Sequence, residues 1–137
     1  MNSLSNTLKR RAVIVCIMVF IAAVHIFRVG SYLPKELSVL YYGYFSDILV
    51  PFGGYFLLYA AEQQLSFLRR WDVKLAAAFL IPAIAETCQY FGVPVFGSFF
   101  DPLDYVMYAV GVVSAVLVDL RVFPHLFDFW SIKNEKP

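Results

Sequence analysis

Apolar residues occur in this chain as four long blocks, at about 12–28, 40–61, 75–90 and 103–120. Polar segments, or segments broken by Gly and Pro, separate the blocks. A helix that crosses the hydrocarbon core of a bilayer needs roughly 17–25 mostly apolar residues. The pattern therefore predicts an all-α polytopic membrane protein with four transmembrane helices in one domain, 1–137. Residues 121–137 are rich in aromatic side chains, which is typical of a tail that lies in the membrane interface.

Composition favours the same class of protein. Hydrophobic residues make up 61% of the chain, charged residues only 15%, and the mean hydropathy is +0.69, far from the averages of soluble domains. A net charge of +1, with basic residues at the block ends, argues against nucleic acid as a partner and leaves the lipid bilayer. Cys16 and Cys88 each lie in an apolar block and are predicted to be free. No complete catalytic, metal or cofactor motif is present, so the sequence predicts neither an enzyme reaction nor a bound metal or cofactor.

Lysine and arginine predict the orientation. Three lie at the amino end, three in the 62–74 connection and three in the tail, against two in 28–36 and none in 91–100. Cytoplasmic loops of membrane proteins carry an excess of these residues. Both termini should therefore be cytoplasmic, and the chain should be a multi-pass protein of the plasma (inner) membrane.

With this orientation, polar residues from different predicted spans fall in one outer layer of the membrane. Ionisable groups are costly in hydrocarbon and usually face a protein interior or a water-filled cavity, so they mark a candidate site. Glu86 shares a helix face with Gln89, and Asp104 shares one with Tyr108, because the spacings are three and four residues. The candidate ligand-binding residues are Arg28, Asp47, Glu86, Gln89, Asp101, Asp104 and Tyr108.

Several of these acids also have a structural interpretation. Asp101, Pro102 and Asp104 form a typical helix start, with an N-cap, a proline at the first helical position and an acid at the third. Capping alone would explain both aspartates. The structural alternative for Glu86 is an ion pair with Arg28 that stabilises the helix bundle. The same alternative applies to Asp47.

Three polar residues near the predicted span ends have simpler interpretations. His25 ends the first predicted span and is expected at the membrane interface. Asp119 and Arg121 end the fourth span, and both are expected to be solvated flanking charges.

The acidic stretch resembles a known signature, that of the VanZ-like family of small bacterial membrane proteins. The family has a Glu-x-x-Gln on one helix and an Asp-x-x-Asp that opens the next. In this chain the pattern is Glu86-x-x-Gln89, a loop, then Phe100-Asp101-x-x-Asp104-x-x-x-Tyr108-x-x-Gly111. Tyr108 replaces a family Asn, and Ser98 lies near the position of a frequent family Arg.

The resemblance covers about residues 75–120, and the four-span layout more loosely. It implies an outward-facing acidic site in the plasma membrane. The family is named for a protein linked to resistance to teicoplanin, a glycopeptide antibiotic that binds cell-wall precursors. The resemblance therefore implies a ligand related to the cell envelope or to the antibiotic.

Four functions are compatible with these residues. The first is binding of a polar ligand, either a lipid-linked envelope precursor headgroup or a cation, with Arg28 neutralising the acids or holding a phosphate. The second is a small proton- or ion-coupled transporter, for which four short helices would need a homodimer. The third is a metal-dependent membrane hydrolase. The fourth is a structural role, with the acids as helix caps and bundle contacts.

Overall fold

The protein is mostly helical in the part that the structure describes. This computed structural model describes residues 2–93, 95 and 100–130, and no strand occurs among them. The predicted all-α class is confirmed. Ser98, named above for the resemblance, lies outside the described residues.

Long helical segments joined by short turns make up the described chain. The first is α1 (Asn2–Ile26), which begins well before the predicted span and so includes the basic residues of the amino end. The second runs without a break through α2 (Lys35–Leu40), η2 (Tyr41–Phe45), α3 (Ser46–Leu57) and η3 (Leu58–Ala61). The third is α4 (Trp71–Tyr90). The fourth is continuous through α5 (Pro102–Leu117), η5 (Val118–Val122) and α6 (Phe123–Leu126). Single helical turns, η1 (Val29–Tyr32) and η4 (Ser66–Arg69), lie in the connections.

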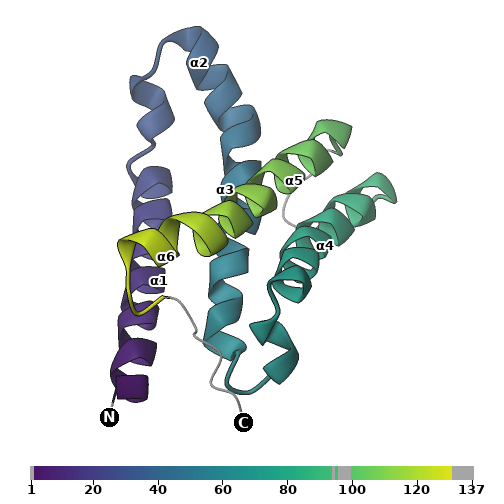
Figure 1. The fold of residues 1–137 in the computed structure, drawn as a ribbon. Coiled ribbons are helices and arrows are strands. Elements are labelled where there is room, and N and C mark those ends of the chain that lie inside the picture. Colours follow the sequence, from purple (N-terminus) through teal and green to yellow (C-terminus); the bar gives the residue numbers. More distant parts are fainter. Residues whose placement is uncertain (1, 94, 96–99, 131–137) are drawn as a thin grey trace.

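Helix α3 is the centre of the arrangement. It packs against α1, α4 and α5. Figure 1 shows α1 and α3 running in opposite directions, while α4 and α5 form a second hairpin that slants away from them. The end of the fourth segment, α6, crosses back towards α1 (Figure 1). Side chains on α3 and α5 thus meet along much of their length.

Close contact between α3 and α5 depends on a glycine. A Cβ atom added at Gly111 would lie 2.2 Å from the carbonyl oxygen of Ile48 and 2.9 Å from Cγ of Pro51. One turn further along α5, Ala115 is fully buried. Small residues that let helix backbones approach closely are typical of helix contacts within membranes.

Helix α5 presents its small and polar residues to the protein and its large aliphatic residues to the outside. Its buried side carries Tyr108, Gly111, Val112 and Ala115. The outward side carries residues that are 45–56% exposed, at the helical spacing of three and four: Leu103, Val106, Val110, Val113 and Leu117. A surface helix of a soluble protein has the opposite arrangement.

One segment of the described chain has both the length and the composition of a membrane span. It is Pro102–Leu126, which contains an 18-residue stretch with a mean hydropathy of 1.9. The other three predicted spans are helical as well, and the crossing of a membrane by any of the four stays a prediction.

Candidate functional site

Four acids and a tyrosine meet where the starts of α3 and α5 pass the end of α4. The side chain of Asp47 interacts with the acids of α4 and α5, and Tyr108 interacts with Asp47, Glu86 and Asp104. The structure thus brings together five of the residues that the sequence singled out. We call them the outer acidic cluster: Asp47, Glu86, Asp101, Asp104 and Tyr108.

Within this cluster, Glu86 connects α4 to the start of α5. Glu86 is only 3% exposed, and its Oε1 accepts a hydrogen bond of 2.7 Å from the backbone N–H of Asp101. Asp101 in turn is the N-cap of α5, since its Oδ1 accepts from the backbone N–H of Leu103 at 2.9 Å. The predicted capping role of Asp101 is confirmed.

This contact changes what Asp104 can do. In a capping box, the acid at the third helical position accepts the backbone N–H of the N-cap residue. Here Glu86 accepts that N–H, and the carboxyl group of Asp104 lies beside the carboxyl group of Asp47 instead. An ionised carboxylate can only accept, so a hydrogen bond between two carboxyl groups requires a proton on one of them.

Tyr108 is the neutral member of the cluster. It is 6% exposed, lies one turn after Asp104 on α5, and its hydroxyl interacts with Glu86. A phenol can donate to a carboxylate while still offering its oxygen as an acceptor. The outer acidic cluster therefore holds carboxyl and phenol oxygens from three helices.

The remaining two predicted site residues make other contacts. Arg28 is exposed, has a left-handed φ of 48°, and its carbonyl oxygen accepts from the backbone and hydroxyl of Ser31, each at 2.8 Å. Among the described residues it forms no ion pair with the acids. Gln89 donates from Nε2 to the carbonyl oxygen of Val95 at 2.7 Å, which holds the connection that follows α4.

That connection begins with a tight helix end. Gly92 has φ 77°, the left-handed conformation that glycine adopts without strain. Its N–H bonds the carbonyl of Gln89, and the next N–H, of Val93, bonds the carbonyl of Cys88, both at 2.9 Å. This pair of bonds is a Schellman motif, which ends α4 just after Glu86 and Gln89.

His25 links α1 to the segment next to Asp47. Its Nδ1 lies 2.8 Å from the carbonyl oxygen of Ile21, and its Nε2 lies 2.9 Å from Oγ of Ser46. A carbonyl oxygen only accepts, so Nδ1 carries a proton and a neutral ring accepts from Ser46 at Nε2. His25 is thus a contact between helices beside the outer acidic cluster.

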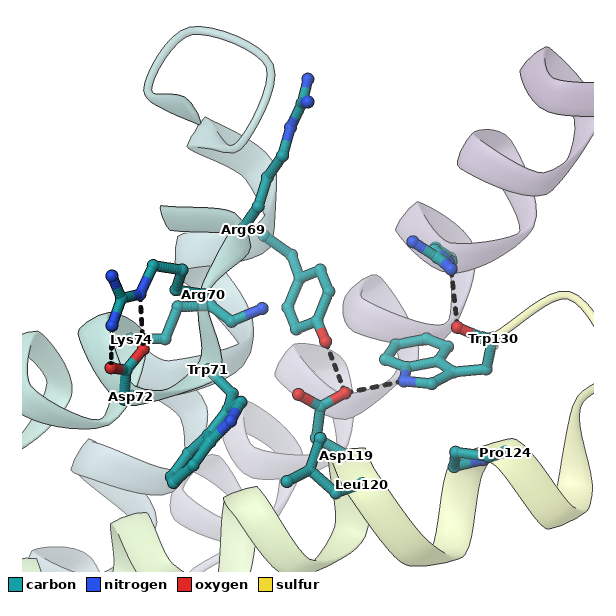
Figure 2. A pocket seen from close by; sticks show the side chains of 11 residues that line it. Arg69, Arg70, Trp71, Asp72, Lys74, Asp119, Leu120, Pro124 and Trp130 are labelled. Carbon is teal, nitrogen blue, oxygen red and sulfur yellow. Dashed lines mark hydrogen bonds and ion pairs between the residues drawn. The ribbon is translucent and has the colours of Figure 1, made fainter. Parts of the chain in front are cut away.

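A second polar group lies at the other end of α3 and α5. Asp119 is 4% exposed. Its carboxylate accepts hydrogen bonds from the hydroxyls of Tyr55 (2.5 Å) and Tyr59, and from Nε1 of Trp130 at 2.8 Å; Figure 2 shows Asp119 with Trp130. The prediction that Asp119 is a solvated flanking charge is therefore wrong, because donors from another helix and from the tail surround it. Arg121 is exposed, as predicted.

Sequence reasoning missed this group, which we call the inner cluster: Tyr55, Tyr59, Lys74, Glu62, Asp119 and Trp130. Lys74 is 2% exposed, pairs with Glu62 at 2.6 Å, and places its Nζ 3.2 Å from the ring centroid of Tyr59. The only signal in the sequence was that tyrosines and an acid lie near the same predicted membrane side.

A pocket of about 610 Å³ lies beside the inner cluster. Figure 2 shows charged residues along its wall. Among them, Arg70 and Asp72 form an exposed ion pair at 2.6 Å, and the Arg70 guanidinium holds the pKa of Asp72 below its ordinary value. The charged lining residues are Arg10, Arg69, Arg70, Asp72, Lys74 and Asp119.

Irregular helical turns accompany both clusters. The π turn η2, Tyr41–Phe45, ends just before Asp47, and the π turn η5, Val118–Val122, contains Asp119. Such turns are rare and occur often at functional sites, since the wider turn redirects the side chains around it. Nothing in the sequence pattern indicated them.

Comparisons with known proteins do not identify a function for the site. No protein-family model matches this chain, and searches of curated proteins and of solved structures found no match. The resemblance to VanZ-like proteins therefore stays a prediction.

Proposed function

We propose that this protein is a multi-pass protein of the plasma membrane that binds a cation, in the simplest case a proton, between Asp47 and Asp104. The observation that supports the proposal most directly is the close approach of these two carboxyl groups. Two neighbouring carboxyl groups form a hydrogen bond with each other only when one of them carries a proton. When both groups are ionised, their charges attract any cation that fits.

The distribution of apolar side chains supports a membrane location. Large exposed apolar residues occur on α1 and α4 as well as on α5; examples are Val15, Val19, Phe20, Leu80, Ile81 and Ile84, each 51–66% exposed. Soluble monomers rarely expose such extended apolar surfaces. Lipid chains are the natural surroundings for these helix faces.

The proposed topology has a direct test. In a variant with Cys16→Ser and Cys88→Ser, single cysteines at Lys35 and Gln64 would report on opposite connections. A thiol reagent that does not cross membranes should label Lys35→Cys in intact cells, and Gln64→Cys only after the cells are opened. Equal labelling of both positions in intact cells would contradict the four-span arrangement.

The backbone carbonyl oxygen of Asp47 lacks its usual helical donor. Pro51 has no N–H, so it cannot donate the usual helical bond to the carbonyl oxygen of Asp47, four residues earlier. Hard cations prefer carboxylate and carbonyl oxygens. Among the described residues no group of three or more His, Cys, Asp or Glu side chains is arranged to hold a metal ion, so the metal-dependent hydrolase has no structural support.

The resemblance suggests an envelope precursor as the ligand, and the acids favour its ammonium group over its phosphate group. A phosphate headgroup would need a cationic partner, and Arg28 forms no ion pair with the acids among the described residues. An ammonium group of an envelope precursor would match the acids directly. We therefore propose a cation or an ammonium group as the ligand.

Cation binding can be measured on the purified full-length protein in neutral detergent. Sodium chloride and methylammonium chloride, compared with choline chloride at the same ionic strength, should raise the unfolding temperature of the wild-type protein. Asp104→Asn should remove this effect, while Asp128→Asn, an exposed aspartate at the other end, should retain it. A cation effect that survives in Asp104→Asn would overturn the proposed site.

Proton-coupled transport is the second candidate function. It is favoured by the π turn Tyr41–Phe45, which ends just before Asp47, since such turns occur often at functional sites. Proton uptake into liposomes containing the wild-type protein, and its loss in Asp104→Asn, would support transport. Binding of cations without any proton flux would leave binding as the function.

A further inference from the structure

The pocket beside the inner cluster lies at the end of the molecule that the predicted orientation places in the cytoplasm. It is formed between the start of α1, the start of α4 and the end of the fourth helical segment. In the proposed membrane location this is the depth of the inner-leaflet headgroups. The inference below rests on that location, but not on the cation site at Asp47 and Asp104.

Cations predominate in the pocket. Four basic residues and two acids line it. Arg70 is paired with Asp72, and Lys74 is paired with Glu62. Arg10 and Arg69 form no ion pair among the described residues, so these two guanidinium groups supply charge that no carboxylate neutralises.

Asp119 keeps its charge, but it forms no ion pair with Arg10 or Arg69 among the described residues. Its oxygens already accept hydrogen bonds from two tyrosines and a tryptophan. It is also 4% exposed, so the tyrosine and tryptophan donors lie between its carboxylate and a ligand in the pocket.

Arg10 is held in place before any ligand arrives. Its Nη2 donates to the carbonyl oxygen of Trp130 at 2.6 Å, and its Nε donates to that of Phe129 at 3.2 Å. Carbonyl oxygens orient a guanidinium without cancelling its charge, and some of its N–H groups remain available. Arg69, by contrast, is exposed, and Figure 2 shows it extending away from Asp119.

We propose that this pocket binds a phosphate-bearing anion, with Arg10 as the fixed contact and Arg69 as the contact that closes on it. Guanidinium groups match phosphate oxygens in charge and geometry. The anion would be the headgroup of an anionic phospholipid or a soluble phosphate, and basic pockets on the cytoplasmic side of membrane proteins commonly bind such headgroups.

The chain contains a built-in probe for this site. Trp71 and Trp130 are its only tryptophans, and both line the pocket. Tryptophan emission of the full-length protein in neutral detergent can therefore be followed while short-chain phosphatidylglycerol, short-chain phosphatidylcholine or inorganic phosphate is added. The proposal predicts a saturable emission change with phosphatidylglycerol and none with phosphatidylcholine, whose headgroup has no net charge.

Inorganic phosphate distinguishes the two sources of the anion. A saturable change with inorganic phosphate as well would identify a soluble phosphate as a ligand, whereas a change with phosphatidylglycerol alone would identify a lipid headgroup. The absence of a saturable change with either compound would overturn the proposal.

Matched variants separate the pocket from general attraction to a basic surface. Arg69→Gln should weaken phosphatidylglycerol binding about fivefold, the effect of one cation near an anionic lipid surface. Arg121→Gln removes an exposed arginine that does not line the pocket and should leave binding unchanged. Equal weakening in both variants, or none in Arg69→Gln, would contradict the assignment.

Discussion

Asp104 and Asp119 lie on one continuous helical segment, Pro102–Leu126, and their surroundings differ. Asp119 receives hydrogen bonds from three neutral donors. Asp104 meets the carboxyl group of Asp47 and lies near Glu86. A buried carboxylate with all its partners is a structural element, because the low dielectric strengthens its bonds. A carboxyl group that meets other acids lacks such partners, which leaves room for a ligand.

A position near the end of an apolar helix does not by itself identify a functional acid. Both residues are acids near the ends of an apolar helix, and Asp119 is the more deeply buried of the two. What differs is whether the protein itself supplies hydrogen-bond donors to the carboxyl group. We therefore propose a functional role for Asp104 with Asp47, and a structural role for Asp119.

The largest effect on stability should come from Asp119→Ala. This variant leaves the two tyrosine hydroxyls and the Trp130 N–H without their acceptor, and each buried group without a partner costs about 1–3 kcal/mol. We expect the free energy of unfolding to fall by roughly 3 kcal/mol or more, measured by unfolding in mixed micelles of detergent and SDS. Asp128→Ala, at an exposed aspartate, is the control and should change it little. If Asp119→Ala lowered the free energy of unfolding by no more than a typical surface substitution does, Asp119 would not be the structural counterpart of Asp104.

Glu86 should show an intermediate effect that depends on the replacement. Glu86→Ala removes the acceptor of the Asp101 N–H and should cost about 2 kcal/mol, within the range for a buried donor left without a partner. Glu86→Gln keeps a carbonyl oxygen at that place and should cost clearly less in the same unfolding assay. If Gln proves as harmful as Ala, the charge of Glu86 matters beyond holding the start of α5.

The smallest effect on stability is expected for Asp104→Asn. The amide can donate to Asp47 and so keeps the contact without needing a proton. The free energy of unfolding should therefore stay within about 0.5 kcal/mol of the wild-type value, as for most substitutions that break no essential contact. A loss as large as that of Asp119→Ala would show that Asp104 is structural too.

Much of the fold could be predicted from the apolar blocks. Each block contains a long helix, and the Asp101-Pro102 start of α5 is confirmed with its cap. The sequence pattern could not place the ends of the first and last helices, because helical hydrogen bonding continues through polar residues once a nucleus exists. It also could not indicate the two π turns, since one extra residue in a turn leaves the composition unchanged.

The candidate site was predicted only in part. Helix spacing and a common depth indicated that Asp47, Glu86 and Asp104 would meet, and the structure brings them together. The partners of Asp119 were missed because Tyr55 and Tyr59 are distant in sequence and come close only through the packing of α3 on α5. Such contacts depend on the rotation of two helices about their axes, which a single sequence does not specify.

We propose that the acid pair at the start of α5 holds a proton, whereas Asp119 accepts hydrogen bonds from three neutral donors and needs no proton to form them. Infrared spectroscopy of the purified protein at neutral pH tests this directly, because a protonated carboxyl group has a carbonyl stretching band that a carboxylate lacks. We predict that this band is present in the wild-type protein, is lost in Asp104→Asn and is retained in Asp119→Asn. A band that is absent from the wild-type spectrum, or that disappears in Asp119→Asn and persists in Asp104→Asn, would contradict the account.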